Sequence, residues 1–470
     1  MNEFIKNINI PIIKLISKEA TIRGIKTYLV GGFVRDIILK RKSKDIDVMV
    51  VGNGIDFAQG ISKKINKKLQ VFKNFGTAML KTKNYEVEFV GARKESYYKN
   101  SRNPKVEQGT LEEDLSRRDF TINSLAISLN KNNFGEIIDL FNGKNDINKK
   151  LIRTPLDPRI TFHDDPLRMF RAARFASQLN FKIEKENLDF IFKEKDRIDI
   201  ISKERINEEL NKILMSNKPS VGFTALKQSG LLEIILPEIC DLEGIDEIEG
   251  KKHKDNFYHT LKVVDNICKN SENLWLRWVA LLHDIGKAKT KKFHKKIGWT
   301  FHGHEYVGSK MVDKIFKRLK LPLNEKMKYV KKLIMLSSRP IVLSLENITD
   351  SAVRRLIYDA GNDIDDLLTL CEADITTKNE FLQKKYLNNF KIVREKIKIV
   401  DERDQIRNFQ PPITGEEIMN SFNIKPCKEI GLIKEYIKES ILNGKIGNSH
   451  KEAKKLMLKK GKSLGLIINE

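Results

Sequence analysis

The feature that most limits the fold is a change of hydrophobic pattern near residue 150. Before it, four short β-branched or alternating runs, TYLV, KDIDVMVV, FGTAMLKT and YEVEFV, are separated by glycine turns and one helical pattern, FVRDIILKR. After it, apolar residues recur every three or four positions, as in PLRMFRAARFASQL. The sequence therefore predicts an α+β chain, with a mixed β-sheet and helices first and an all-α remainder.

Polar and proline-containing segments indicate where this chain divides. A length of 470 residues is large for a single core, and breaks occur at NGKND, in the polar stretch before residue 257 and at NFQPPITGEE. We expect four parts, 1–150, 151–245, 246–400 and 401–470. The polar segment 95–116 is expected to be a mobile loop.

Composition favours a nucleic-acid partner. The 87 Lys and Arg residues exceed the 63 Asp and Glu residues and leave a formal charge of +24, although a general lysine bias would give the same excess. No apolar run reaches the roughly 20 residues that cross a bilayer. The four cysteines have no CxxC spacing. We expect a cytoplasmic protein with no membrane contact, and no partner protein is indicated.

Two carboxylates in the second run are the first candidate site. Side chains alternate along a strand, so Asp45 and Asp47 share one face. Such a pair suits a hard divalent cation such as Mg²⁺, as phosphoryl transfer requires, although an exposed acidic strand is the common alternative. Gly31 and Gly32 open a helix where backbone N–H groups can hold phosphates. Glu88 can be a third carboxylate if its strand lies beside this one.

Three ordered motifs carry a resemblance to a known family. LVGGFVRD with KDIDVMV, RRDFTINSLAIS and DDPLRMFRAARFASQL resemble, in that order, the bacterial-type (class II) tRNA nucleotidyltransferases, the CCA-adding enzymes of the poly(A) polymerase superfamily. The resemblance covers at least residues 25–235. It implies a nucleotidyltransferase head, a helical neck and body, and addition of CCA to the tRNA 3′ end from CTP and ATP with Mg²⁺.

The resemblance also implies roles for individual residues of the head. Asp45 and Asp47 would hold the metal, and Gly31, Gly32 and Arg35 would form the triphosphate turn. Arg118, Asp119 and Asn123 would recognise the ribose and steady the nucleotide. The alternative for this last motif is a charged cap on a helix beginning at INSLAIS.

In the neck the family's nucleotide selector corresponds to DDPLR, with Asp164 where the family usually has Glu. If both residues lie on a helix, Asp165 and Arg168 project from one face and can read a Watson–Crick edge. Arg171 and Arg174 follow on the same pattern and are candidates for phosphate contacts. The alternative is an ordinary surface salt bridge, with the two later arginines toward solvent.

A second constellation in the C-terminal half resembles an HD domain. His259, the adjacent His283 and Asp284, and Asp374 match the imidazole and carboxylate set that binds a divalent metal in such domains. His302 and His304 are further candidate ligands, while Ser337 stands where another histidine is expected. The domain is then either a phosphohydrolase or a scaffold for tRNA.

Three functions remain open on the sequence alone. CCA addition fits every motif, and the alternatives within the same chemistry are a poly(A) polymerase or an enzyme that adds only A or only C. A different class, an RNA-binding HD phosphohydrolase with an inactive head, would be expected to lack a carboxylate or the glycine turn, and both are present.

Overall fold

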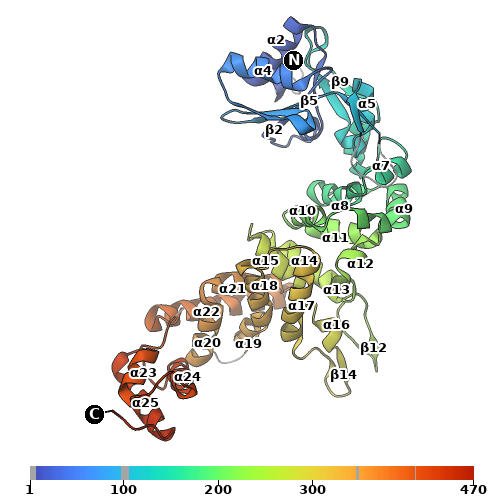
Figure 1. Cartoon of the computed structure of the whole chain (residues 1–470). Helices are drawn as coiled ribbons and strands as arrows, with labels where there is room; N and C mark the ends of the chain where they lie inside the picture. Colours follow the sequence, from blue (N-terminus) through green and yellow to red (C-terminus); the bar gives the residue numbers. More distant parts are fainter. Residues whose placement is uncertain (1–6, 97–104, 346–348, 408, 470) are drawn as a thin grey trace. The chain divides into compact units, whose positions relative to one another are not determined.

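The computed structural model describes residues 7–96, 105–345, 349–407 and 409–469. The chain forms two compact units, Met1–Ile235 and Leu236–Glu470. In Figure 1 the strands of the first unit are blue and cyan, its later helices are green, and the second unit runs from yellow to red. The single division lies ten residues before the expected boundary at 245, and the four-part division stays a prediction.

The first unit is built on a seven-stranded mixed sheet with the order β3-β4-β5-β2-β1-β8-β9. Only β2 and β5 are parallel neighbours, and the other pairs are antiparallel. The strands are β1 (Thr27–Val30), β2 (Asp45–Val50), β3 (Leu69–Phe72), β4 (Thr77–Lys81), β5 (Glu86–Gly91), β8 (Leu125–Ser128) and β9 (Ile137–Asp139). The expected mixed sheet is confirmed.

Helices and short 3-10 turns complete the head. Helix α4 packs on β4 and β5, where Phe57 lies against Phe89 with ring centroids 6.1 Å apart. This burial of aromatic side chains anchors the helix on the sheet. The elements are α2 (Pro11–Arg23), α3 (Gly32–Ile38), α4 (Gly54–Ile65), η1 (Lys73–Phe75), α5 (Leu111–Ser116), η2 (Thr121–Asn123), η3 (Lys131–Asn133) and α6 (Gly143–Lys149).

The segment expected to be a mobile loop is largely ordered. Strands β6 (Arg93–Ser96) and β7 (Lys105–Gln108) pair antiparallel, and α5 follows. Helix α5 begins with a capping box, since the Thr110 side chain accepts from the Glu113 N–H and the Glu113 carboxylate accepts from the Thr110 N–H. The loop prediction is wrong for these residues, and its part at 97–104 lies outside the described residues.

The neck continues the first unit with helices. Helix α8 packs against α10 and α11 and buries Met169, Phe170 and Phe175. The expectation of an entirely helical remainder is wrong in detail, because β10 (Leu151–Ile152) pairs parallel with β11 (Lys182–Ile183). The helices are α7 (Pro158–Asp164), α8 (Leu167–Leu179), α9 (Lys185–Glu194), η4 (Lys195–Ile200), α10 (Lys203–Leu214), α11 (Pro219–Gln228) and α12 (Leu231–Ile235).

The second unit is mostly helical. Trp278 of α15 is fully buried and lies near Phe316 of α17 at the centre of its core. Two hairpins, β12 (Glu247–Ile248) with β13 (Lys251–Lys252) and β14 (Lys292–His294) with β15 (Gly298–Thr300), interrupt the helices.

The helices of this unit fall into an earlier and a later group. The first are α13 (Pro237–Cys240), α14 (Asn256–Ile267), α15 (Leu274–Leu282), α16 (Lys287–Thr290), α17 (His304–Arg318), α18 (Glu325–Leu336) and α19 (Arg339–Leu345). The others are α20 (Asp350–Ala360), η5 (Gly361–Asp363), α21 (Ile364–Ala373), α22 (Glu380–Asp404), α23 (Gly415–Phe422), α24 (Lys428–Leu442) and α25 (His450–Ser463). Among the described residues, no helix has the length and apolar character to cross a membrane.

Candidate active site and metal centre

A glycine turn joins β1 to α3 at the edge of the candidate active site. Gly31 has φ 72°, which side chains disfavour, and a Cβ there would lie 2.9 Å from Arg118 Nη1 and 3.1 Å from Asp47 Oδ2. Gly32 begins helix α3. The turn therefore requires glycine both for its backbone and for the space beside a carboxylate and an arginine.

The positions of Asp45, Asp47 and Glu88 follow from side-chain alternation along β2 and from the pairing of β2 with β5. Ile46 and Val48 are fully buried, whereas Asp45 is exposed and Asp47 is half-buried between them. Strands β2 and β5 pair in parallel with Asp47 opposite Glu88. The condition set for Glu88, a strand beside the acidic one, is therefore met.

The electrostatics of this cluster fit a cation. Burial raises the pKa of Asp47 to about 6, and Glu88 and Asp45 add to this rise, while Arg118 opposes it. Asp47 of β2 and Glu88 of β5 line one cavity; Asp45, two residues before Asp47 on β2, is not in its lining. A buried carboxylate whose ionisation is disfavoured by two neighbouring carboxylates belongs to the oxygen-rich kind of set that Mg²⁺ binds.

The cavity above these carboxylates is rich in arginine. Its volume is about 1020 Å³, and Phe175 lies in its wall. Such a concentration of guanidinium groups suits the phosphates of a nucleotide. The arginines that line the cavity are Arg35, Arg93, Arg117, Arg118, Arg168, Arg171 and Arg205.

Asp114, which the sequence analysis missed, holds two of these arginines. Its side chain is fully buried; Oδ1 accepts from Arg117 Nη2 at 2.6 Å and Oδ2 accepts from Arg118 Nη2 at 3.0 Å. Burial alone would raise the pKa of Asp114, but Arg118 and Arg117 outweigh it and lower the pKa. The available signal was its spacing, since residues three and four apart meet on a helix.

The RRDFTIN motif forms a hydrogen-bonded chain, and not a helix cap. Arg35 Nη1 donates to Asn123 Oδ1 at 2.8 Å, and Asn123 Nδ2 donates to Asp119 Oδ1 at 2.9 Å. INSLAIS continues into strand β8, so the alternative of a capped helix is wrong. Arg118, Asp119 and Asn123 all line the cavity, and their contact with ribose stays a prediction.

The neck selector differs from the expected geometry. Asp165 lies before helix α8 in an extended conformation because Pro166 follows it, and its carboxylate accepts from the Leu167 N–H at 3.1 Å. The expectation that both residues lie on one helix face is therefore wrong. Asp165 and Arg168 nevertheless line the same cavity.

Arg168 and Arg174 are both held by protein groups. Arg168 is buried and donates to the carbonyls of Arg117 at 2.7 Å and Thr161 at 3.3 Å. Arg174 Nε donates to Glu209 at 2.5 Å and its guanidinium lies 4.0 Å from the Phe175 ring centroid. Arg174 is absent from the cavity lining, so the structure assigns it a packing contact and leaves its phosphate contact a prediction.

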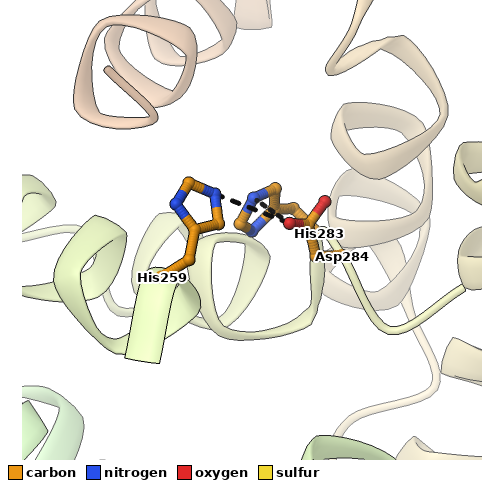
Figure 2. Close-up of side chains that lie close together, drawn as sticks. All are labelled: His259, His283 and Asp284. Carbon is orange, nitrogen blue, oxygen red and sulfur yellow. Dashed lines mark ion pairs between the residues drawn. The ribbon is translucent and has the colours of Figure 1, made fainter. Parts of the chain in front are cut away.

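The second unit brings the HD residues together. His259 comes from α14, while His283 and Asp284 follow the end of α15, and Figure 2 shows the three side chains converging. One candidate ligand atom from each lies within 4.8 Å of the others. His259 Nε2 also lies 2.8 Å from Asp374 Oδ1, so all four predicted residues meet.

The hydrogen bonding of His283 leaves one of its two ring nitrogens available to a metal. Its Nδ1 pairs with the Ala280 carbonyl at 2.8 Å and is therefore the protonated nitrogen. The buried Nε2 has no hydrogen-bond partner within the described part of the chain and lies 3.4 Å from Asp284 Oδ2. An unpartnered imidazole nitrogen facing carboxylates fits a divalent cation. His304 Nε2 lies 3.6 Å from Asp284, whereas His302 is exposed and Ser337 Oγ donates to the Ile334 carbonyl.

Models of three protein families match successive parts of the chain. They are the poly A polymerase head domain over residues 27–153, the probable RNA- and SrmB-binding site of polymerase A over 180–242, and the HD domain over 256–378. The matches follow the order of the head, the neck and the metal centre described above.

Solved structures share the fold. A CCA-adding enzyme in an apo form matches with a TM-score of 0.65 at 23% identity, over 97% of this chain and 98% of the other. The Thermotoga maritima CCA-adding enzyme complexed with tRNA matches with a TM-score of 0.61 at 22% identity, over 97% and 98% of the two chains. At these identities the likeness concerns the fold.

Curated relatives extend the likeness to sequence. An A-adding tRNA nucleotidyltransferase of Aquifex aeolicus is 33% identical over 303 residues, which are 61% of this chain but only 35% of that protein. A multifunctional CCA protein of Shewanella frigidimarina is 32% identical over 381 residues, covering 77% of this chain and 86% of the relative. The chain therefore belongs to the bacterial-type family of CCA-adding tRNA nucleotidyltransferases.

Proposed function

We propose that this protein adds CCA to the 3′ end of tRNA, using CTP and ATP. The observation that carries the proposal is the parallel pairing of Asp47 with Glu88 beside the Gly31 turn, inside an arginine-lined cavity. The 32% identity to a multifunctional CCA protein over most of its length supports tRNA as the substrate.

The carboxylates Asp45, Asp47 and Glu88 would hold Mg²⁺. When bound, the metal supplies charge neutralisation for the triphosphate and for the attacking 3′-hydroxyl. Arg118 beside Gly31 binds triphosphate oxygens in this proposal, since it borders both the turn and Asp47. Asp114 keeps that guanidinium in place through Oδ2, which accepts from both Arg118 Nε and Arg118 Nη2.

The neck would choose the base. Arg168 uses only part of its five N–H donors on the two carbonyls that fix it, and its guanidinium borders the cavity. Asp165 offers a carboxylate acceptor in the same wall. A donor and an acceptor in fixed positions can discriminate C and A from the other bases, because a wrong base leaves buried polar groups unpaired.

A second candidate is addition of A alone. The relative from Aquifex aeolicus that favours this reading is an A-adding enzyme, although this chain spans about a third of its length. A poly(A) polymerase is the further alternative, and the family model of the head also includes it by name.

The HD centre supports a second, metal-dependent function. His259, His283, Asp284 and Asp374 would hold a divalent cation, which supplies an activated water for phosphoester hydrolysis when bound. We also propose a cytoplasmic location, because tRNA and nucleoside triphosphates occur there and none of the four cysteines, all of them described, is in a disulfide.

Three tRNA substrates test these functions. The protein is incubated with Mg²⁺ and with tRNA ending before CCA, after one C or after both C residues, with CTP and ATP singly and together. Full CCA addition predicts three nucleotides on the first substrate. Extension of the last substrate only would indicate A addition, and long A tails would indicate a poly(A) polymerase. Asp45→Ala with Asp47→Ala is the control.

A further inference from the structure

A second cavity of about 740 Å³ lies in the head beside the catalytic strands. Glu86 of β5 lines it, while Glu88, two residues further along the same strand, lines the catalytic cavity. Two residues of a strand span about 7 Å, and Glu86 pairs with Asp45 as Glu88 pairs with Asp47. The two cavities are therefore neighbours along β2 and β5.

Cationic side chains dominate the rim of this second cavity. Five of the lining residues are basic, and the one acidic residue, Glu86, is already paired with Lys81 at 2.6 Å. Lys42, Lys44 and Lys83 are exposed and form no ion pair with any residue that the structure describes. The basic lining residues are Lys40, Arg41, Lys42, Lys44 and Lys83. We call this group the basic rim.

The basic rim is built on two segments that the backbone holds together. Lys40 takes a left-handed conformation with φ 56°, and the Arg41 N–H bonds the Asp36 carbonyl, so helix α3 ends in a tight turn. The Glu86 N–H then donates to the Lys44 carbonyl at 2.9 Å. This bond ties the 40–44 loop to the β4–β5 turn, which carries Lys83.

The floor of the cavity is apolar and partly aromatic. Phe33 and Ile37, one turn apart on α3, are buried there, and Ile10 and Tyr85 complete it. Lysines above an apolar and aromatic surface are the combination that binds a nucleic-acid strand, with phosphates on the cations and a base or ribose on the floor. A small anion would be bound by the cationic side chains alone and would not require an apolar and aromatic floor.

From this arrangement we infer that the basic rim is an RNA-binding site that holds a phosphate-rich stretch of the tRNA substrate next to the catalytic carboxylates. The inference rests on the proposed function for the identity of the RNA. The basic rim is separate from the nucleotide-binding residues, because the two cavities are lined by different residues.

A charge-matched pair of variants tests the site. In one, Lys42, Lys44 and Lys83 are changed to Ala; in the control, the exposed Lys63, Lys67 and Lys68 of the same unit are changed to Ala. Binding of tRNA lacking CCA is measured by fluorescence anisotropy over a range of salt concentrations. We expect about tenfold weaker binding for the first variant, and a salt dependence smaller by about two to three charges. The control should bind like the wild type.

Steady-state kinetics distinguish tRNA binding at the basic rim from binding of free nucleotide. The KM for CTP should stay unchanged in the first variant, and a rise in that KM with unchanged tRNA binding would assign the cavity to free nucleotide and overturn the inference. Equal tRNA binding by the two variants, with normal extension by the wild type, would overturn the inference alone. A wild type that extends no tRNA would remove the proposed function and the inference together.

Discussion

Asp119 of the head and Arg171 of neck helix α8 form an ion pair in the wall of the catalytic cavity, with Arg171 Nε donating to Asp119 Oδ2 at 2.8 Å. Asp119 is only 6% exposed. Its other oxygen accepts from Asn123, which in turn accepts from Arg35. One buried carboxylate thus connects the triphosphate turn to helix α8, which also carries the base-selecting Arg168.

The Asp119→Asn variant should be less stable than the wild type at pH 7, and its free energy of unfolding should fall less steeply as the pH is lowered. A neutral amide removes the ion pair with Arg171, whose side chain is 38% exposed, and should cost about 2 kcal/mol at pH 7, as protonation of the carboxylate does. Burial alone would raise the pKa of Asp119, but Arg171 and Asn123 lower it to about 2. The ionised form therefore stabilises the fold above about pH 4, and about 2 kcal/mol is lost as the pH falls toward 2. Urea unfolding from pH 7 downward measures this, and an unchanged pH slope in the variant would contradict it.

The Asp114→Asn variant should weaken nucleotide binding without touching the catalytic carboxylates. Arg117 and Arg118 each lose a charge-assisted bond to the same side chain, so we expect the KM for CTP to rise about tenfold or more. The control is Glu112→Gln on the same helix, because Glu112 is exposed. If kcat falls while KM stays constant, Asp114 does not act through the triphosphate-binding arginines.

The Gly31→Ala variant separates backbone strain from crowding of the site. The methyl group would meet Arg118 Nη1 at 2.9 Å, whereas at Gly24, with a similar φ of 63°, nothing lies within 4 Å. Gly24→Ala should cost about 1 to 2 kcal/mol of stability. Gly31→Ala should cost more, because Gly31 at φ 72°, ψ −140° lies outside the left-handed region that Gly24 occupies at φ 63°, ψ 27°. The midpoint of thermal unfolding measures both. Only Gly31→Ala should lower kcat/KM, by about a hundredfold. Equal activity of the two variants would show that the turn does not shape the site.

The sequence predicted the individual residues of this site better than their arrangement in space. Alternation placed Asp45 and Asp47, and the glycine pair marked the start of α3, because both features depend on neighbouring residues. The pairing of Glu88 with Asp47 depends on strand order. A chain segment of 35 residues, 51–85, with two further strands separates β2 from β5, and local pattern does not determine which strands become neighbours.

Two errors have local causes. The segment LAIS at 125–128 is too short for the spacing of its apolar residues to distinguish a strand from a helix. It is also buried on both faces, so the alternation of apolar and polar residues that identifies a strand is absent from it. Asp165 was placed on a helix, although a residue before proline disfavours helical angles. Asp114 is an omission of a different kind, because it lies one helical turn before Arg117 and Arg118, outside the RRDFTIN motif that carries the resemblance.

The Asp47→Asn variant should be inactive and yet more stable without Mg²⁺. Burial, together with Glu88 and Asp45, makes the ionised form of Asp47 unfavourable, so a neutral amide of the same shape relieves that cost in the metal-free protein. Thermal unfolding at pH 7.5 should show a higher midpoint for the variant without Mg²⁺, and a smaller rise on adding Mg²⁺. A lower midpoint would mean that Asp47 is needed for packing and not for the metal.

The HD centre should bind its metal independently of nucleotide addition. His283→Ala removes a buried Nε2 that lies 3.4 Å from Asp284 and 3.7 Å from Asp374, whereas His302→Ala changes an exposed histidine as a control. We expect titration calorimetry with Mn²⁺ or Ni²⁺ to show one site fewer in His283→Ala than in His302→Ala. Because the centre lies in the other compact unit, CCA addition should be the same in both variants. A joint loss of metal binding and CCA addition would instead show that the two units depend on each other, which the separate cores do not require.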